Sequence, residues 1–207
     1  MSPPTDPRTD PPEGARPRDL VTAALRFYGV LFAAAWLWRG AVRGEPLLYA
    51  SAAAAGRGVD PVRDVSVGLL AAGLMIAFSY LLTVQTRGGR ALARGMAELL
   101  GPLSTRQVAA LALLSGIAEE AFFRGALQPR VGFVWASLIF GAVHFIPRPE
   151  FRLWTAFAMA AGFLLGFLFE ASGNLVAPVV AHVAVNAVNL TLLVRGGPWT
   201  EPLDASG

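Results

Sequence analysis

Residues 108–125 read VAALALLSGIAEEAFFRG, an apolar stretch that carries three ionisable side chains, Glu119, Glu120 and Arg124. Two later apolar stretches carry one histidine each, His144 and His182, and the chain has no other histidine. An ionisable side chain at membrane depth costs at least about 2.5–3.5 kcal/mol on insertion scales. We therefore expect these side chains to serve a function, because carboxylates and imidazoles together form proton-transfer or metal-binding sets.

The composition around this stretch is that of a membrane protein. Hydrophobic residues make up 55% of the 207 residues, charged residues make up only 15%, and the mean hydropathy is +0.53. A soluble domain carries about 25% charged residues. The predicted fold class is therefore all-α, a polytopic helical bundle whose surroundings are the lipid bilayer.

Six apolar stretches predict about six transmembrane helices. They are Leu20–Trp38, Val65–Val84, Val108–Gly125, Val131–Ile146, Leu153–Phe169 and Leu175–Val194. A helix needs about 20 residues, with a range of about 17–25, to cross the hydrocarbon layer. The fourth stretch therefore needs flanking residues to reach across.

The transmembrane domain is predicted to occupy residues 20–195, with its catalytic part in residues 104–195. Residues 1–19 hold six prolines and seven charged residues, so we expect a disordered tail there. Residues 196–207 form a short C-terminal tail. Residues 87–101 alternate apolar and basic side chains, which predicts either a helix lying in the headgroup region or an ordinary basic loop.

The distribution of arginine predicts the orientation of the bundle. All 17 basic residues are arginine, which we attribute to compositional bias, so the basic character does not indicate nucleic-acid binding. Of the arginines near the span ends, ten lie on the side of the two termini and five lie on the opposite side. This excess predicts cytoplasmic termini in a bacterial inner membrane. The chain has no cysteine, which excludes disulfides and thiolate chemistry.

Helix geometry predicts that the acidic and imidazole groups meet at one depth. At about 1.5 Å per residue, Glu119 lies about 15 Å from the turn at Pro129, and His144 lies about 18 Å from the same turn. His182 lies about 12 Å from Asn174, which belongs to a turn on the same membrane face. Three separate helices thus bring these groups to a common layer near the middle of the membrane.

Residues four apart on a helix share a face, which adds partners to this layer. This spacing pairs His182 with Asn186, His144 with Phe140, and Glu120 with Arg124. Glu119 and Glu120 point about 100° apart on a helix of 3.6 residues per turn, so they should do different jobs. We expect Arg124 to hold Glu120 ionised as a structural group and Glu119 to be the freer base.

These residues form three motifs, and with them the chain resembles the CPBP group of intramembrane proteases. That group includes CAAX prenyl endopeptidases and Abi-type proteins that process bacteriocins or confer immunity to them. The motifs are Glu119-Glu120 followed by Arg124, Phe140 followed by His144, and His182 followed by Asn186, the last after a Gly173–Pro178 lead-in. The resemblance covers residues 107–193 in the family's order.

The resemblance implies hydrolysis of a peptide bond in a membrane protein or peptide substrate. Glu119 and His144 would activate a water molecule, while His182 and Asn186 would donate hydrogen bonds to the oxyanion. Glu120, Arg124 and Phe140 would support the site. No cofactor is certain, although Glu119, His144 and His182 could bind a single Zn²⁺. No His-Glu-x-x-His pair is present, which favours chemistry without a metal.

Two other classes of protein fit part of this pattern. An ion-coupled transporter also carries glutamate and histidine at membrane depth, but the six spans show no internal repeat of the kind common in transporters. A catalytically silent immunity or binding protein is the other alternative, and the intact motifs argue against it. Trp154, near a span end, is expected to be an interfacial anchor rather than a substrate contact.

Overall fold

The computed structural model describes residues 17–197, and this part of the chain is almost entirely helical. In its first half lie α1 (Pro17–Trp36), the π-helix η1 (Leu37–Val42), α2 (Ala52–Arg57), α3 (Pro61–Gln85) and α4 (Arg87–Leu100). The second half holds α5 (Thr105–Glu120), the π-helix η2 (Ala121–Leu127), α6 (Gln128–Val131), α7 (Phe133–Val143), the 3₁₀ turn η3 (Pro149–Phe151), α8 (Arg152–Ser172) and α9 (Val176–Arg195). Within residues 17–197 there is no strand, so the all-α prediction is confirmed.

Within residues 17–197, four segments are long and apolar enough to cross a membrane, which makes the chain an integral membrane protein. They are Asp19–Val42, Pro61–Gln85, Pro149–Ser172 and Val176–Arg195. The other two predicted spans are helical but less complete. The predicted span Val108–Gly125 corresponds to α5 followed by the π-helix η2. The predicted span Val131–Ile146 corresponds to α7, which has only 11 residues.

The shortness of α7 has a local cause. It begins after Gly132, whose φ of +85° lies outside the helical region, and it ends at Val143, four residues before Pro147. Proline is tolerated only in the first turn of a helix, so the chain cannot continue far beyond this point. The count of six full-length transmembrane helices is therefore not confirmed.

Side-chain caps define the ends of the helices that enclose the site. Thr86 ends α3 and its hydroxyl caps α4, so the chain turns sharply between the two helices. Ser104 and Gln107 form a capping box that starts α5. Residues 87–101 therefore form a helix rather than a loop.

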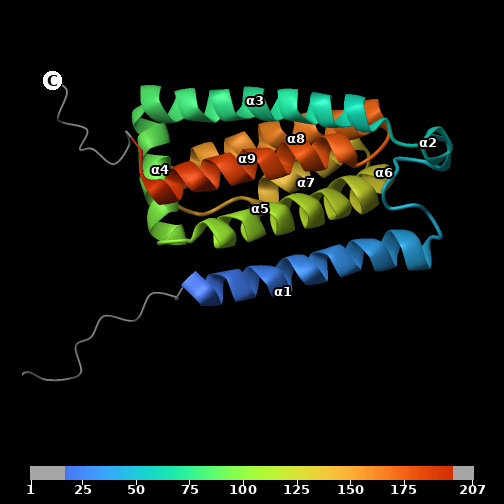
Figure 1. Ribbon diagram of the computed structural model, residues 1–207, viewed down its shortest axis with the longest axis horizontal. Coiled ribbons are helices and arrows are strands. Elements are labelled where there is room, and N and C mark those ends of the chain that lie inside the picture. The colour runs from blue at the N-terminus through green and yellow to red at the C-terminus, as the bar shows by residue number, and fades with distance from the viewer. Residues whose placement is uncertain (1–16, 198–207) are drawn as a thin grey trace, which may run out of the picture.

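Helix α9 lies at the centre of the bundle and packs against α3, α5 and α8 (Figure 1). Helix α1 runs along the outside of α5, and α7 packs on α8. Helix α4 runs across one end of the bundle, at which α1 begins and α9 ends (Figure 1). The two described ends of the chain thus lie on the same side, as an even number of crossings requires.

Two glycines allow the central helices to approach closely. A Cβ on Gly116 of α5 would lie 2.5 Å from Val183 Cγ2 of α9, and a Cβ on Gly68 of α3 would lie 2.6 Å from the carbonyl oxygen of Ala177. Such distances are too short for any side chain, so both contacts require glycine. Small residues at close helix contacts are typical of membrane bundles.

The predicted tails fall mostly outside the described residues. Residues 1–16 of the predicted N-terminal tail and residues 198–207 of the predicted C-terminal tail are not described. The first helix begins at Pro17, three residues earlier than the predicted start of the transmembrane domain. The last helix ends at Arg195, where the domain was predicted to end.

Candidate active site

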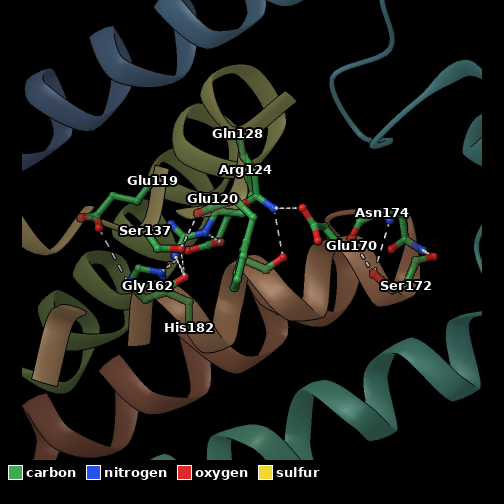
Figure 2. Close-up of polar contacts among 12 residues, drawn as sticks. Glu119, Glu120, Arg124, Gln128, Ser137, Gly162, Glu170, Ser172, Asn174 and His182 are labelled. Carbon is green, nitrogen blue, oxygen red and sulfur yellow. Dashed lines mark hydrogen bonds and ion pairs between the residues drawn. The ribbon is translucent and has the colours of Figure 1, made fainter. Parts of the chain in front are cut away.

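The two adjacent glutamates of α5 point in different directions, as their spacing predicts. Figure 2 shows Glu119 extending away from Glu120, while Glu120 points toward Arg124 and His182. Glu120 is completely buried, whereas 7% of Glu119 remains exposed and its side chain lines a cavity. One carboxylate is thus enclosed by protein and the other faces open space.

Glu120 and Arg124 form a buried ion pair, with Arg124 Nε 3.2 Å from Glu120 Oε2. The guanidinium of Arg124 also donates a hydrogen bond of 3.2 Å to the carbonyl oxygen of Gly162 in α8. Its central carbon lies 4.3 Å from the centre of the Phe140 ring of α7, a cation–π contact. Arg124 therefore ties the segment after Glu120 to two further helices.

The π-helix η2 starts directly after Glu120. Single π-turns inside helices are often found at functional sites, because they change the direction of the side chains that follow. Arg124 lies inside this turn and is 1% exposed. The sequence pattern predicted a regular helix here and gave no signal of the π-turn.

His182 of α9 bonds to the buried carboxylate, a contact that the sequence did not reveal. Its Nδ1 lies 2.7 Å from Glu120 Oε1. The carboxylate oxygens that face Arg124 and His182 are acceptors, so His182 Nδ1 donates the hydrogen. Nε2 of His182 is then directed toward Glu119, at 4.0 Å from Oε2.

His144 follows the last residue of α7 and is oriented by the main chain. Its Nδ1 lies 2.7 Å from the carbonyl oxygen of Phe140. A carbonyl oxygen only accepts hydrogen bonds, so Nδ1 carries the hydrogen and Nε2 of the neutral ring carries a lone pair. Nε2 lies 3.6 Å from Glu119 Oε2, and the ring packs edge-on against Trp154 at 5.6 Å between ring centres.

Glu119 Oε2 therefore faces both imidazoles but bonds to neither. The distances of 3.6 Å and 4.0 Å exceed hydrogen-bond length, and this buried oxygen has no hydrogen-bond partner among the described residues. Tyr28 of α1 lines the same cavity as this glutamate and interacts with it electrostatically. The spacing between Glu119 and the imidazoles suits a bridging water molecule.

Asn186 lies one turn from His182 on α9, and its amide is held in one orientation. Its Nδ2 is 2.9 Å from Ser115 Oγ of α5. Ser115 donates its own hydrogen to the carbonyl oxygen of Ala112, at 3.3 Å, so it must accept from Asn186. Asn186 keeps a second amide hydrogen, and its side chain lines the cavity.

The cavity has a volume of about 380 Å³ and lies between α1, α3, α4, α5, α8 and α9. Its walls are mainly apolar, and its polar lining includes Glu119, His144, His182 and Asn186. Apolar pockets with a few convergent polar groups are typical ligand sites. Leu92 and Met96 of α4 line the cavity too, so this helix covers one end of it.

The three side chains that the sequence named as possible zinc ligands, Glu119, His144 and His182, face one another but do not form a closed metal site. Within residues 17–197, no group of three or more histidine, aspartate or glutamate side chains is arranged to hold a metal ion. Zinc ligands lie about 2.0–2.2 Å from the metal and surround it tetrahedrally. Two ligand atoms on one such zinc are about 3.3–3.6 Å apart, and Glu119 Oε2 lies 3.6 Å from Nε2 of His144 and 4.0 Å from Nε2 of His182.

All seven residues predicted for the site lie together, and four further residues were not predicted as members. The predicted residues are Glu119, Glu120, Arg124, Phe140, His144, His182 and Asn186. Of the others, Trp154 packs edge-on against His144, a contact that its expected place near a span end did not predict. Tyr28 and Ser79 are common residue types whose spacing gave no signal, because each meets the site from another helix. Ser115 lies four residues before Glu119 on α5, so this spacing could have pointed to it.

Comparison with known proteins agrees with this arrangement. A sequence model of the family described as Rce1-like, type II CAAX prenyl endopeptidase, matches residues 101–188. A Bacillus subtilis (strain 168) protein named YpbD, described as uncharacterized, is 46% identical over 80 residues, which are 38% of this chain and 41% of YpbD. No solved structure matches the chain.

The match and the geometry concern the same part of the chain. Residues 101–188 include both glutamates, both histidines and Asn186. The match leaves out α1 and α3, from which Tyr28 and Ser79 reach the cavity. Residues 101–188, which are less than half of the chain, therefore resemble the Rce1-like family of type II CAAX prenyl endopeptidases.

Proposed function

We propose that this protein is an intramembrane endopeptidase that hydrolyses a peptide bond with water activated by Glu119 and His144. The observation that supports it most is the position of Glu119 Oε2, which lies without a hydrogen-bond partner between two imidazole nitrogens at the wall of an apolar cavity. A buried carboxylate and a neutral imidazole are both suited to accept protons.

The attacking water would bridge Glu119 and His144. Glu119 Oε2 and His144 Nε2 are both hydrogen-bond acceptors, because His144 carries its hydrogen on Nδ1. One water molecule donates a hydrogen to each and directs a lone pair of its oxygen toward the cavity. As that oxygen bonds to the scissile carbonyl carbon, its proton passes to Glu119.

The oxyanion that forms would be stabilised by His182 and Asn186. With Nδ1 of His182 bonded to the carboxylate of Glu120, Nε2 is the nitrogen that would donate to the oxyanion, in the imidazolium form of the ring. The amide hydrogen of Asn186 that Ser115 does not use is the second donor. In other hydrolases one such donor contributes about 2.7–4 kcal/mol to lowering the barrier.

Collapse of the tetrahedral intermediate that carries this oxyanion completes the reaction. The carbon–nitrogen bond breaks, and the proton held by Glu119 passes to the amine nitrogen of the departing segment. The products are one chain with a new carboxylate and one with a new amine. Arg124 does not touch the reacting atoms in this scheme, but it pairs with Glu120, whose other carboxylate oxygen orients His182.

The substrate class follows from the surroundings of the site. The cavity lies among helices that can cross a membrane and is walled mostly by apolar side chains. Such walls favour a membrane-associated protein or peptide, for example a leader or a C-terminal sorting segment. We further propose a bacterial inner membrane with cytoplasmic termini, on the basis of the arginine distribution.

The function can be tested with purified protein in phospholipid vesicles. A library of synthetic apolar peptides is added, and cleavage is followed by mass spectrometry. Glu119→Gln, which keeps the size of the side chain, should lower cleavage at least about 100-fold, because a general base contributes about 10²–10⁴-fold. Glu98→Gln is the matched control, since Glu98 lies exposed on α4 outside the cavity lining.

Each outcome of this experiment has a defined meaning. Cleavage by wild type and by Glu98→Gln, but not by Glu119→Gln, supports the protease. No cleavage by wild type contradicts it. Proton or sodium flux in the same vesicles, lost in Glu119→Gln, would instead support the transporter alternative.

A further inference from the structure

A third polar side chain of α9 faces the cavity in line with the two proposed oxyanion donors. His182, Asn186 and Asn189 are spaced by four and three residues, so they share one helix face, and all three line the cavity. The proposed reaction uses the first two and leaves Asn189 without a role. Asn189 also lies just outside residues 101–188, the part that resembles known proteins.

Asn189 is held by Ser79 of α3. Ser79 Oγ lies 3.2 Å from Asn189 Oδ1 and 3.0 Å from the carbonyl oxygen of Ile76. The hydroxyl has one hydrogen, so it either donates to Asn189 or, with the amide turned over, accepts from it. Asn189 keeps at least one free amide hydrogen in both arrangements.

That hydrogen has no other recorded partner within residues 17–197, and it lies beside an apolar wall. Leu111 of α5 and Leu193 of α9 line the same cavity. A polar group in such surroundings is unfavourable unless it is hydrogen-bonded, and a molecule entering the cavity can supply the acceptor. Main-chain carbonyl oxygens are the acceptors that every peptide substrate carries.

The distance along α9 indicates which part of a peptide would meet Asn189. Seven residues separate His182 from Asn189, or about 10.5 Å along the helix axis. An extended peptide advances about 3.3 Å per residue, so this distance corresponds to about three residues. The third residue from the scissile bond would therefore lie at Asn189.

We propose that Asn189, held by Ser79, is a specificity-determining residue that donates a hydrogen bond to the main-chain carbonyl about three residues from the scissile bond. The substrate is extended there and carries an apolar side chain against the leucine wall. This assignment rests on the proposed protease function. It predicts that cleavage depends on residues well beyond the scissile bond.

Disulfide trapping tests the register directly, because the chain has no cysteine of its own. A peptide cleaved by wild type in the vesicle experiment is resynthesised with a single cysteine at each of the first five positions on either side of its scissile bond. Asn189→Cys, in a Glu119→Gln background that prevents turnover, is oxidised with each peptide. Thr191→Cys is the matched control, since Thr191 lies on the same helix but does not line the cavity.

We expect the Asn189→Cys disulfide yield to peak at the third residue on one side and the Thr191→Cys yield to show no peak. We also expect Asn189→Leu to lower kcat/KM about tenfold, the value of one neutral hydrogen bond, while Thr191→Ala keeps the wild-type value. Asn189→Ser replaces Asn189→Leu if the larger side chain prevents folding.

Three results would overturn the assignment. They are a peak at the first or fifth residue, equal yields for the two cysteine variants, or wild-type kcat/KM in the Asn189 variants. If any of these three results occurs while wild type cleaves and Glu119→Gln does not, the protease function stands and only the role of Asn189 is lost. If wild type cleaves no peptide, both proposals are contradicted.

Discussion

Replacement of Arg124 by alanine tests how the site is supported. Arg124 is 1% exposed and Glu120 is fully buried. The substitution removes the ion pair of 3.2 Å, the hydrogen bond to the carbonyl oxygen of Gly162 and the cation–π contact with Phe140. Glu120 would keep only His182 as a partner, so a carboxylate would remain buried without its guanidinium.

The expected loss in the free energy of unfolding is about 3–5 kcal/mol, the value for breaking a buried ion pair from one side. Native proteins are stable by only about 5–15 kcal/mol, so Arg124→Ala should unfold at a visibly lower denaturant concentration. The assay is equilibrium unfolding in mixed detergent–lipid micelles. Arg106→Ala is the control, because Arg106 is an exposed arginine in the first turn of the same helix.

Cleavage should fall as well, because Glu120 also orients His182. Glu120→Gln combined with Arg124→Ala removes both charges, so it should recover part of the lost stability but little activity. This double variant separates two effects of Arg124→Ala. One is the loss of stability from a buried, unpaired charge, and the other is the loss of activity when His182 is no longer oriented. If Arg124→Ala lost less than about 1 kcal/mol, the range of an exposed pair, and cleaved at the wild-type rate, the supporting role would be wrong.

Three further predictions concern the reacting groups. Glu119→Ala and His144→Ala should each abolish cleavage without unfolding the protein, and cleavage above a few per cent of wild type would remove the residue from the mechanism. Asn186→Ala should lower kcat about 100- to 1000-fold with little change in KM, as expected when one oxyanion donor is lost; a change confined to KM would indicate ground-state binding instead. Elemental analysis of wild type and His182→Ala, with cleavage measured in the presence of a chelator, should show activity without stoichiometric zinc. Zinc present in active wild type and lost together with activity in His182→Ala would overturn a mechanism based on side chains and water.

The depth of the reactive groups could be predicted from the sequence because helix rise is nearly constant. Counting residues from the turns placed Glu119, His144 and His182 in one layer, and in the structure Glu119 Oε2 lies 3.6 Å and 4.0 Å from the two imidazoles. The pairing of Glu120 with Arg124 was predictable for the same reason, since four residues separate them. Both predictions depend only on the geometry of single helices.

Contacts between helices could not be predicted in this way. Residue counting gives the depth of a side chain but not how a helix is rotated against its neighbours. The bond from His182 to Glu120 depends on that rotation, as do the contacts of Tyr28 and Trp154 with the site. The π-turn after Glu120 adds a further rotation that no residue type in the sequence indicates.

The close approach of α5 and α9 connects the fold to the chemistry. Gly116 lies one turn before Glu119 and Glu120, and its contact Val183 is the residue after His182. A side chain at position 116 would therefore separate the two helices next to the bond of 2.7 Å between His182 and Glu120. A bond of this length does not survive a shift of 1 Å in donor–acceptor geometry. Gly116 thus lets α5 and α9 pack closely and also sets the distance over which Glu120 can orient His182. A substitution at this position would therefore disturb the helix packing and the site together.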